Sequence, residues 1–137
     1  MLRLKPAQVA EMLAHAREGA PEEICGLLAG KDGQVLRVYR GTNIAASRRV
    51  RYELEPRQQL EIMLAIEAAG EQMIGIYHSH PMSPAYPSCT DQALAFYPES
   101  VYVIVSLAEP RNPILMAYRL LDGKIEEEEL TIGDTDN

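Results

Sequence analysis

The most informative stretch of the sequence is residues 78–91, where two histidines and an aspartate occur at short spacing. His78 and His80 are separated by one residue in a segment that predicts a β-strand, so both imidazoles should point to the same face of a sheet. Asp91 follows after a further ten residues, and Ser88 is suited to cap a helix whose first turn contains this aspartate. The loop between them has three prolines and is therefore stiff. A loop of this kind can bring Asp91 back beside the histidines.

Two histidines and one aspartate provide three protein ligands for a metal ion. Zinc with three protein ligands keeps a fourth position for water, which is the arrangement of a catalytic rather than a structural site. Nitrogen and oxygen donors also suit iron or manganese, but zinc is favoured for hydrolysis because it lowers the pKa of water to about 7. Such a reaction needs a proton acceptor. Glu23 begins an otherwise apolar strand and can face the site from the end of the sheet, whereas Glu22 points the other way.

Taken together, these residues resemble the JAMM (MPN+) motif of metalloproteases. The motif is His-x-His, seven residues, Ser, two residues and Asp, and it matches His78, His80, Ser88 and Asp91. Glu23, in the segment EICGLLAG, resembles the upstream catalytic glutamate of that family, which lies three positions before a glycine. The resemblance runs from the first predicted helix to about residue 121. It is greatest for small bacterial members that cut sulfur-carrier, ubiquitin-like proteins from their conjugates.

The resemblance implies a fold, a cofactor, an activity and a role for each motif residue. The fold would be α/β, a single JAMM/MPN-like domain with a mixed, curved β-sheet packed by about three helices. His78, His80 and Asp91 would hold one zinc ion per chain. Glu23 would act as general base and then general acid, and Ser88 would donate a hydrogen bond to the oxyanion. The reaction would be hydrolysis of an amide or isopeptide bond at the C-terminal glycine of a ubiquitin-like sulfur-carrier protein.

The hydrophobic pattern predicts the elements that must position these residues. Helices are expected at residues 6–18, 56–70 and 88–97, and strands at 23–29, 34–39, 50–54, 73–80, 101–107, 113–121 and 125–132. The expected buried stripes are Val9, Met12, Leu13 and Ala16 on the first helix and Leu60, Met63, Leu64 and Ala68 on the second. The segments 30–33 and Asp122-Gly123 predict turns. We expect residues 1–132 to form one metalloprotease domain and residues 133–137 a frayed acidic tail.

Charge and composition exclude several other classes. The net charge is −7, and seven of the 20 acidic residues lie in residues 122–137, which leaves a nearly neutral body. Nucleic-acid binding is not expected, because the only basic cluster is Arg48, Arg49 and Arg51, which suits a solvated strand edge or a partner-docking patch. No segment has the apolar length of a signal peptide or a membrane span. With only two cysteines, the chain is expected to be reduced and cytoplasmic. The oligomeric state is not predicted.

The sequence leaves several alternative hypotheses open. A zinc deaminase would need a second cysteine after Cys89 and an H-x-E segment, and no HExxH helix motif is present. The main alternatives are therefore a zinc peptidase of cell-wall or phage-tail peptides and a non-catalytic MPN-type interaction module. Cys89 is either unrelated to the site or a modulator of the metal, and Cys25 reads as a small buried hydrophobe. Asn43 and Tyr86 are either surface residues or part of a substrate groove.

Overall fold

The structure is a computed structural model that describes residues 1–133; residues 134–137, in the expected acidic tail, lie outside the described residues. Its elements in chain order are β1 (Leu2–Leu4), α1 (Pro6–Gly19), β2 (Cys25–Lys31), β3 (Gln34–Arg40), α2 (Pro56–Ala68), β4 (Gln72–His80), α3 (Cys89–Ala93), β5 (Val101–Ser106), β6 (Ile114–Leu121), β7 (Lys124–Glu128) and β8 (Leu130–Ile132). None of the helices within the described range is long and apolar enough to cross a membrane.

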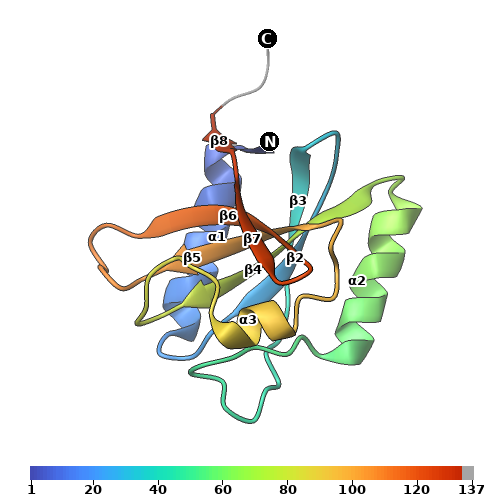
Figure 1. Cartoon of the computed structure of the whole chain (residues 1–137). Coiled ribbons are helices and arrows are strands. Elements are labelled where there is room, and N and C mark those ends of the chain that lie inside the picture. Colours follow the sequence, from blue (N-terminus) through green and yellow to red (C-terminus); the bar gives the residue numbers. More distant parts are fainter. Residues whose placement is uncertain (134–137) are drawn as a thin grey trace.

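All eight strands form one mixed sheet in the order β7-β6-β5-β4-β2-β3-β1-β8. Strands β4 and β5 are parallel, β1 is parallel to both of its neighbours, and the other pairs are antiparallel. Strands β7 and β8 lie at opposite ends of this order although only Glu129 separates them in the chain. The sheet therefore curves until its two edges meet near the N-terminus, as the red segment in Figure 1 shows. The expected mixed, curved sheet with three helices is confirmed.

The two faces of the sheet bury separate apolar clusters. Along β5, Val101, Val103 and Val105 pack on the side of α1, while Tyr102 and Ile104 pack on the side of α2. In Figure 1, α1 lies behind the sheet and α3 in front of it. Since successive side chains alternate between the faces, this arrangement confirms the prediction that the strand starting at residue 101 is buried on both sides.

The buried stripe predicted for the second helix is largely wrong. Leu60 and Leu64 are 58% and 56% exposed, whereas Ile62 and Ile66 face the sheet and are buried. The helix contains apolar residues on more than one face, so its 3.6-residue periodicity alone does not choose the face that packs. The stripe of α1 is confirmed, because Met12 and its apolar neighbours pack into the core.

Two predicted strand boundaries also need correction. Residues 50–54 do not form a strand. The side chain of Asn43 donates to the carbonyl of Arg51 and accepts from the amide of Glu53, so it occupies backbone groups that would otherwise pair with a neighbouring strand. Only an isolated bridge joins Asn43 to Leu54. Residues 125–132 form two strands rather than one, because β7 pairs with β6 and β8 pairs with β1. The short strand Leu2–Leu4 that receives β8 was not predicted.

The third helix is shorter than predicted, and this affects the space beside it. Helix α3 ends at Ala93 rather than at residue 97. Beyond it, the amide of Tyr97 donates to the hydroxyl of Tyr102 on β5 over 3.0 Å, which directs the chain towards the sheet. Both predicted turns are confirmed, with positive φ at Asp32-Gly33 and at Asp122-Gly123, as a two-residue hairpin turn requires.

Candidate metal centre

The two histidines lie at the carboxyl end of β4, a central strand of the sheet. The strand alternation places His78 and His80 on the same face as Ile76, which packs under α2, and opposite Tyr77, which packs under α1. Both imidazoles are buried, with exposed fractions of 1% and 3%. The sequence therefore predicted their common face correctly, and the neighbouring strands supply the burial.

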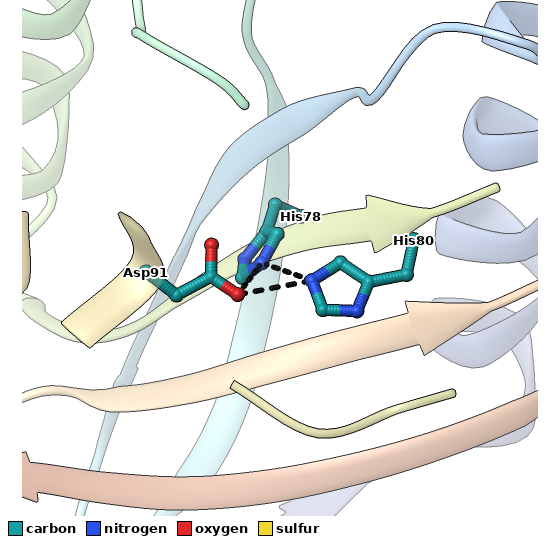
Figure 2. Close-up of side chains that lie close together, drawn as sticks. All are labelled: His78, His80 and Asp91. Atoms are coloured by element: carbon teal, nitrogen blue, oxygen red, sulfur yellow. Dashed lines mark hydrogen bonds and ion pairs between the residues drawn. The ribbon is translucent and has the colours of Figure 1, made fainter. Parts of the chain in front are cut away.

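Asp91 in the first turn of α3 completes a compact group of three donors. Figure 2 shows the three side chains converging, with Nε2 of each histidine facing the Asp91 carboxylate. The two Nε2 atoms are 3.2 Å apart, and Asp91 Oδ2 lies 3.1 Å from His78 Nε2 and 2.9 Å from His80 Nε2. Tetrahedral ligands at the usual zinc bond length of about 2.0–2.1 Å stand roughly 3.3 Å from one another. The donor set and its spacing therefore fit a zinc ion.

Hydrogen bonds outside this group orient two of the three donor residues, His80 and Asp91. His80 Nδ1 lies 2.8 Å from the carbonyl oxygen of Pro84. Donation by Nδ1–H to that oxygen leaves the Nε2 lone pair free for a metal. Asp91 is held by a reciprocal pair in which its amide donates to Ser88 Oγ over 3.0 Å and its Oδ2 accepts from the Ser88 amide over 2.9 Å. The capping interpretation of Ser88-x-x-Asp91 is thus confirmed, and it also orients Asp91.

Burial and mutual charge set the protonation of the three residues. Burial lowers the pKa of His78, and the Asp91 carboxylate only partly offsets this. For His80, burial also acts to lower the pKa, but hydrogen bonds to Asp91 and Pro84 outweigh it and the pKa is raised. For Asp91, burial acts to raise the pKa, yet hydrogen bonds from both histidines hold it well below its usual range. Asp91 is therefore an anion facing two imidazoles, which is a cation-binding arrangement.

Glu23 lies just before β2 and faces the same site. It is 6% exposed, and its Oε1 is buried without a hydrogen-bond partner among the described residues. Burial raises the pKa of its carboxyl to about 7; the charge of His80 opposes this rise and that of Asp91 adds to it. A buried carboxyl with a free oxygen and a near-neutral pKa has the properties of a proton-transfer group.

Three hydrogen bonds outside the strand ladder hold the backbone around Glu23. Its amide donates to the carbonyl of Arg48 over 2.7 Å, and its carbonyl accepts from Asn43 Nδ2 over 2.9 Å. The next amide, of Ile24, donates to Ser79 Oγ over 2.8 Å. Ser79 is the middle residue of the His-Ser-His segment, so the same strand carries two of the candidate metal donors and holds the backbone beside Glu23.

The remaining candidate residues differ in their burial and in their contacts. Ser88 is exposed, and its Oγ accepts a hydrogen bond from the Asp91 amide; no acceptor for its own hydroxyl hydrogen is found among the described residues. Asn43 braces the loop that follows β3, instead of offering its amide to a groove. Tyr86 is 57% exposed. Cys25 is buried, which raises the pKa of its thiol to about 12, and Cys89 is exposed and free. Neither cysteine belongs to the ligand group found among the described residues.

One aromatic residue at the site was not predicted. Tyr52 stacks on His78 with ring centroids 4.5 Å apart and an interplanar angle of 23°. It also lines a pocket of about 450 Å³, together with Leu27, Arg51, Glu53, Leu54, Pro56, Gln59, Ile76, Leu94, Phe96, Tyr97 and Tyr102. This contact could not be predicted from the local pattern, because Tyr52 lies in an irregular loop, where a strand was expected, and no periodicity orients its side chain. The ring lies between the candidate metal donor His78 and a mainly apolar pocket.

The chain is similar to known proteins over most of its length. A family model described as prokaryotic homologs of the JAB domain matches residues 5–120. The chain is 40% identical over 134 residues to the CysO-cysteine peptidase of Mycobacterium tuberculosis, covering 96% of this chain and 91% of that protein. It is 46% identical over 101 residues to a desampylase of Haloferax volcanii, covering 69% and 73%. A solution structure from Desulfitobacterium hafniense superposes with a TM-score of 0.89 at 40% identity, covering 99% and 96%. The chain therefore belongs to the family of prokaryotic JAB-domain proteins, which confirms the JAMM resemblance.

Proposed function

We propose that this chain is a zinc-dependent hydrolase of amide or isopeptide bonds, which releases or trims a ubiquitin-like sulfur-carrier protein at its C-terminal glycine. The observation that carries the proposal is that three buried metal donors lie near the carboxyl of Glu23, whose Oε1 has no hydrogen-bond partner among the described residues. Three ligands leave a coordination position open, and a near-neutral carboxyl beside it can transfer protons. A purely structural metal site needs neither feature.

In the proposed mechanism His78, His80 and Asp91 hold one zinc ion. Bound zinc supplies Lewis-acid chemistry, because it lowers the pKa of water and polarises a carbonyl oxygen. Glu23 accepts a proton from the attacking water at Oε1 and delivers it to the leaving nitrogen as the C–N bond breaks. The Ser88 hydroxyl donates a hydrogen bond to the oxyanion of the tetrahedral intermediate, and a single donor of this kind contributes about 10²–10³ in rate.

The substrate class is supported by the relatives and by the pocket. One relative is named a CysO-cysteine peptidase, another a desampylase, and a third a probable TtuB-protein conjugate cleaving protease. The pocket is mainly apolar, and one of its lining residues, Tyr52, stacks on His78. An extended polypeptide tail crossing the site would place one apolar side chain there. Both cysteines are free, which accords with a cytoplasmic location for this activity.

The test is cleavage of a defined carrier by matched variants. The zinc-loaded protein is incubated with a sulfur-carrier protein that bears a peptide extension after its terminal glycine, and the product masses are followed over time. Glu23→Gln removes the proposed base, while Glu22→Gln removes a neighbouring exposed carboxylate that pairs with Arg48 at 3.2 Å. Zinc content is measured in each protein. The wild type and Glu22→Gln should cleave after the glycine, and Glu23→Gln should keep its zinc and lose about 10²–10⁴ in rate.

Other outcomes distinguish the alternatives. A zinc-loaded wild type that leaves the carrier intact but cleaves a cell-wall or phage-tail peptide would overturn the substrate assignment alone. Failure on every amide substrate with zinc bound would favour a non-catalytic MPN-type interaction module. Full activity of Glu23→Gln would remove Glu23 from the mechanism.

A further inference from the structure

The loop of residues 81–87 joins the histidine ligands to the helix that carries the aspartate ligand. Three consecutive carbonyl oxygens in this loop, those of residues 83–85, each accept a hydrogen bond from a side chain. Ser106 Oγ donates to Ser83 over 2.6 Å, His80 Nδ1 lies 2.8 Å from the Pro84 oxygen, and the Tyr118 hydroxyl donates to Ala85. We call this set of bonds the carbonyl clamp.

The carbonyl clamp supplies three of the four hydrogen bonds that described residues outside the loop make to it, the fourth being from Gln92 Nε2 to the Pro87 carbonyl. Three of the seven loop residues are prolines, which have no amide hydrogen to donate. Among the described residues, the loop makes a single backbone–backbone hydrogen bond outside the regular elements, from the amide of Tyr86 to Pro84. The path of the chain from His80 to Ser88 is therefore set mostly by the side chains that hold its carbonyls.

The two hydroxyl donors come from buried residues of the sheet. Ser106 ends β5 and Tyr118 lies in β6, and each is 4% exposed. A buried hydroxyl without a partner is costly, so the Tyr118 hydroxyl favours the one loop geometry that satisfies it. The ring of Tyr86 packs edge-on against Tyr118 with centroids 5.8 Å apart and restricts the loop further.

We propose that Tyr118 and Ser106 are positioning residues for the metal centre. The inference rests on the proposed function, because it assumes that the three donors hold zinc. Neither hydroxyl bonds to a ligand atom of the centre; both act through the loop that sets the distance between His80 and Asp91. The carbonyl clamp orders this loop in the metal-free protein, so metal binding does not have to bear the entropic cost of ordering it.

The expected effect is a selective loss of zinc affinity. Removing a group that orients a metal ligand typically weakens metal binding by about 10–100-fold. Tyr118 acts one bond further away, through Ala85, so the lower end of this range applies. Tyr118→Phe keeps the ring and deletes only the donor, and it should raise the Kd for zinc about tenfold.

A matched control exists on the other face of the sheet. Tyr77 is fully buried and its hydroxyl makes one hydrogen bond, to His15 Nδ1 over 2.8 Å. Tyr77→Phe therefore deletes the same group from a buried tyrosine in the α1 cluster. The Kd for zinc is measured for the wild type, Tyr118→Phe, Ser106→Ala and Tyr77→Phe by competition with a chromogenic chelator, and the visible spectrum of each cobalt(II)-loaded protein is recorded. Thermal unfolding of the metal-free proteins reports the general loss of stability.

The proposal predicts that Tyr118→Phe and Ser106→Ala weaken zinc binding about tenfold and alter the cobalt spectrum. Tyr77→Phe should lose comparable stability but bind zinc within twofold of the wild type. Equal affinities for Tyr118→Phe and the wild type, or equal losses in both Tyr→Phe variants, would overturn it. A wild type that binds zinc without cleaving any carrier would contradict the substrate assignment and leave this inference standing. A wild type that does not bind zinc would overturn both.

Discussion

Replacing Glu23 by glutamine is expected to stabilise the metal-free protein at alkaline pH and to have a much smaller effect near pH 5. The carboxyl is 6% exposed and one of its oxygens has no hydrogen-bond partner among the described residues. Burial is the main cause that raises its pKa from 4.5 to about 7. The folded protein thus keeps this proton up to about pH 7, whereas the unfolded chain releases it near pH 4.5.

The sign and size of the effect follow from these two pKa values. Between them the native state binds more protons than the unfolded state, so the free energy of unfolding falls as the pH rises. A difference of about 2.5 between the pKa values corresponds to about 3 kcal/mol of stability lost above pH 7. Glutamine does not ionise. The stability difference between Glu23→Gln and the wild type should therefore grow by about 2.5 kcal/mol from pH 5 to pH 8, or roughly 8 °C in Tm.

The assay is urea and thermal unfolding of both proteins after metal removal, at pH 5 and pH 8. Glu22→Gln is the control, since it deletes an exposed carboxylate from the adjacent position. Saturating zinc provides a second control, because a nearby dication favours the ionised carboxylate and lowers the pKa of Glu23. The gap between Glu23→Gln and the wild type should then shrink.

A stability difference that stays constant between pH 5 and pH 8 would refute this reasoning, because it would mean that the Glu23 carboxyl titrates alike in the folded and unfolded states. The same pH-dependent gap in Glu22→Gln would also refute it, since the effect would then be one of general charge.

Three further perturbations test the site. Zinc at about 1,000 times its Kd should stabilise the wild type by about 4 kcal/mol, whereas Asp91→Asn should show almost no zinc-dependent shift in Tm because a charged ligand is lost. Ser79→Ala leaves the buried amide of Ile24 without its acceptor; it should cost about 1–3 kcal/mol in urea unfolding, and Ser79→Thr should restore most of it. Tyr52→Ala removes the ring that stacks on His78 and lines the pocket. It should raise KM for the carrier about fivefold in steady-state kinetics, because the substrate would lose about 1 kcal/mol of contact with this ring.

Much of the fold follows from local patterns in the chain. The alternation of apolar residues after Val101 predicted a strand buried on both faces, and the two helices that begin with a proline start where expected. The periodicity was insufficient for α2, because more than one face of this helix is apolar. The structure packs Ile66, and not Leu64, against the sheet. It also failed for residues 125–132. They divide into β7 and β8 at the two edges of the sheet, because β8 pairs with β1 from the opposite end of the chain.

The sequence by itself determined the ligand types and their common face. His78 and His80 share a face because side chains alternate along a strand, and the spacing of Ser88 and Asp91 is that of a capped helical turn. These features depend on residues close together in the chain, so local geometry suffices to predict them.

Only the tertiary structure decided what surrounds those ligands. The near-neutral pKa of Glu23, the stacking of Tyr52 on His78 and the hydroxyl of Tyr118 beneath the loop of residues 81–87 all join segments far apart in the chain. Burial, and with it the energy of a charge or an unpaired hydroxyl, is a property of the assembled neighbours. No spacing of residue types encodes it before the sheet has closed around the site.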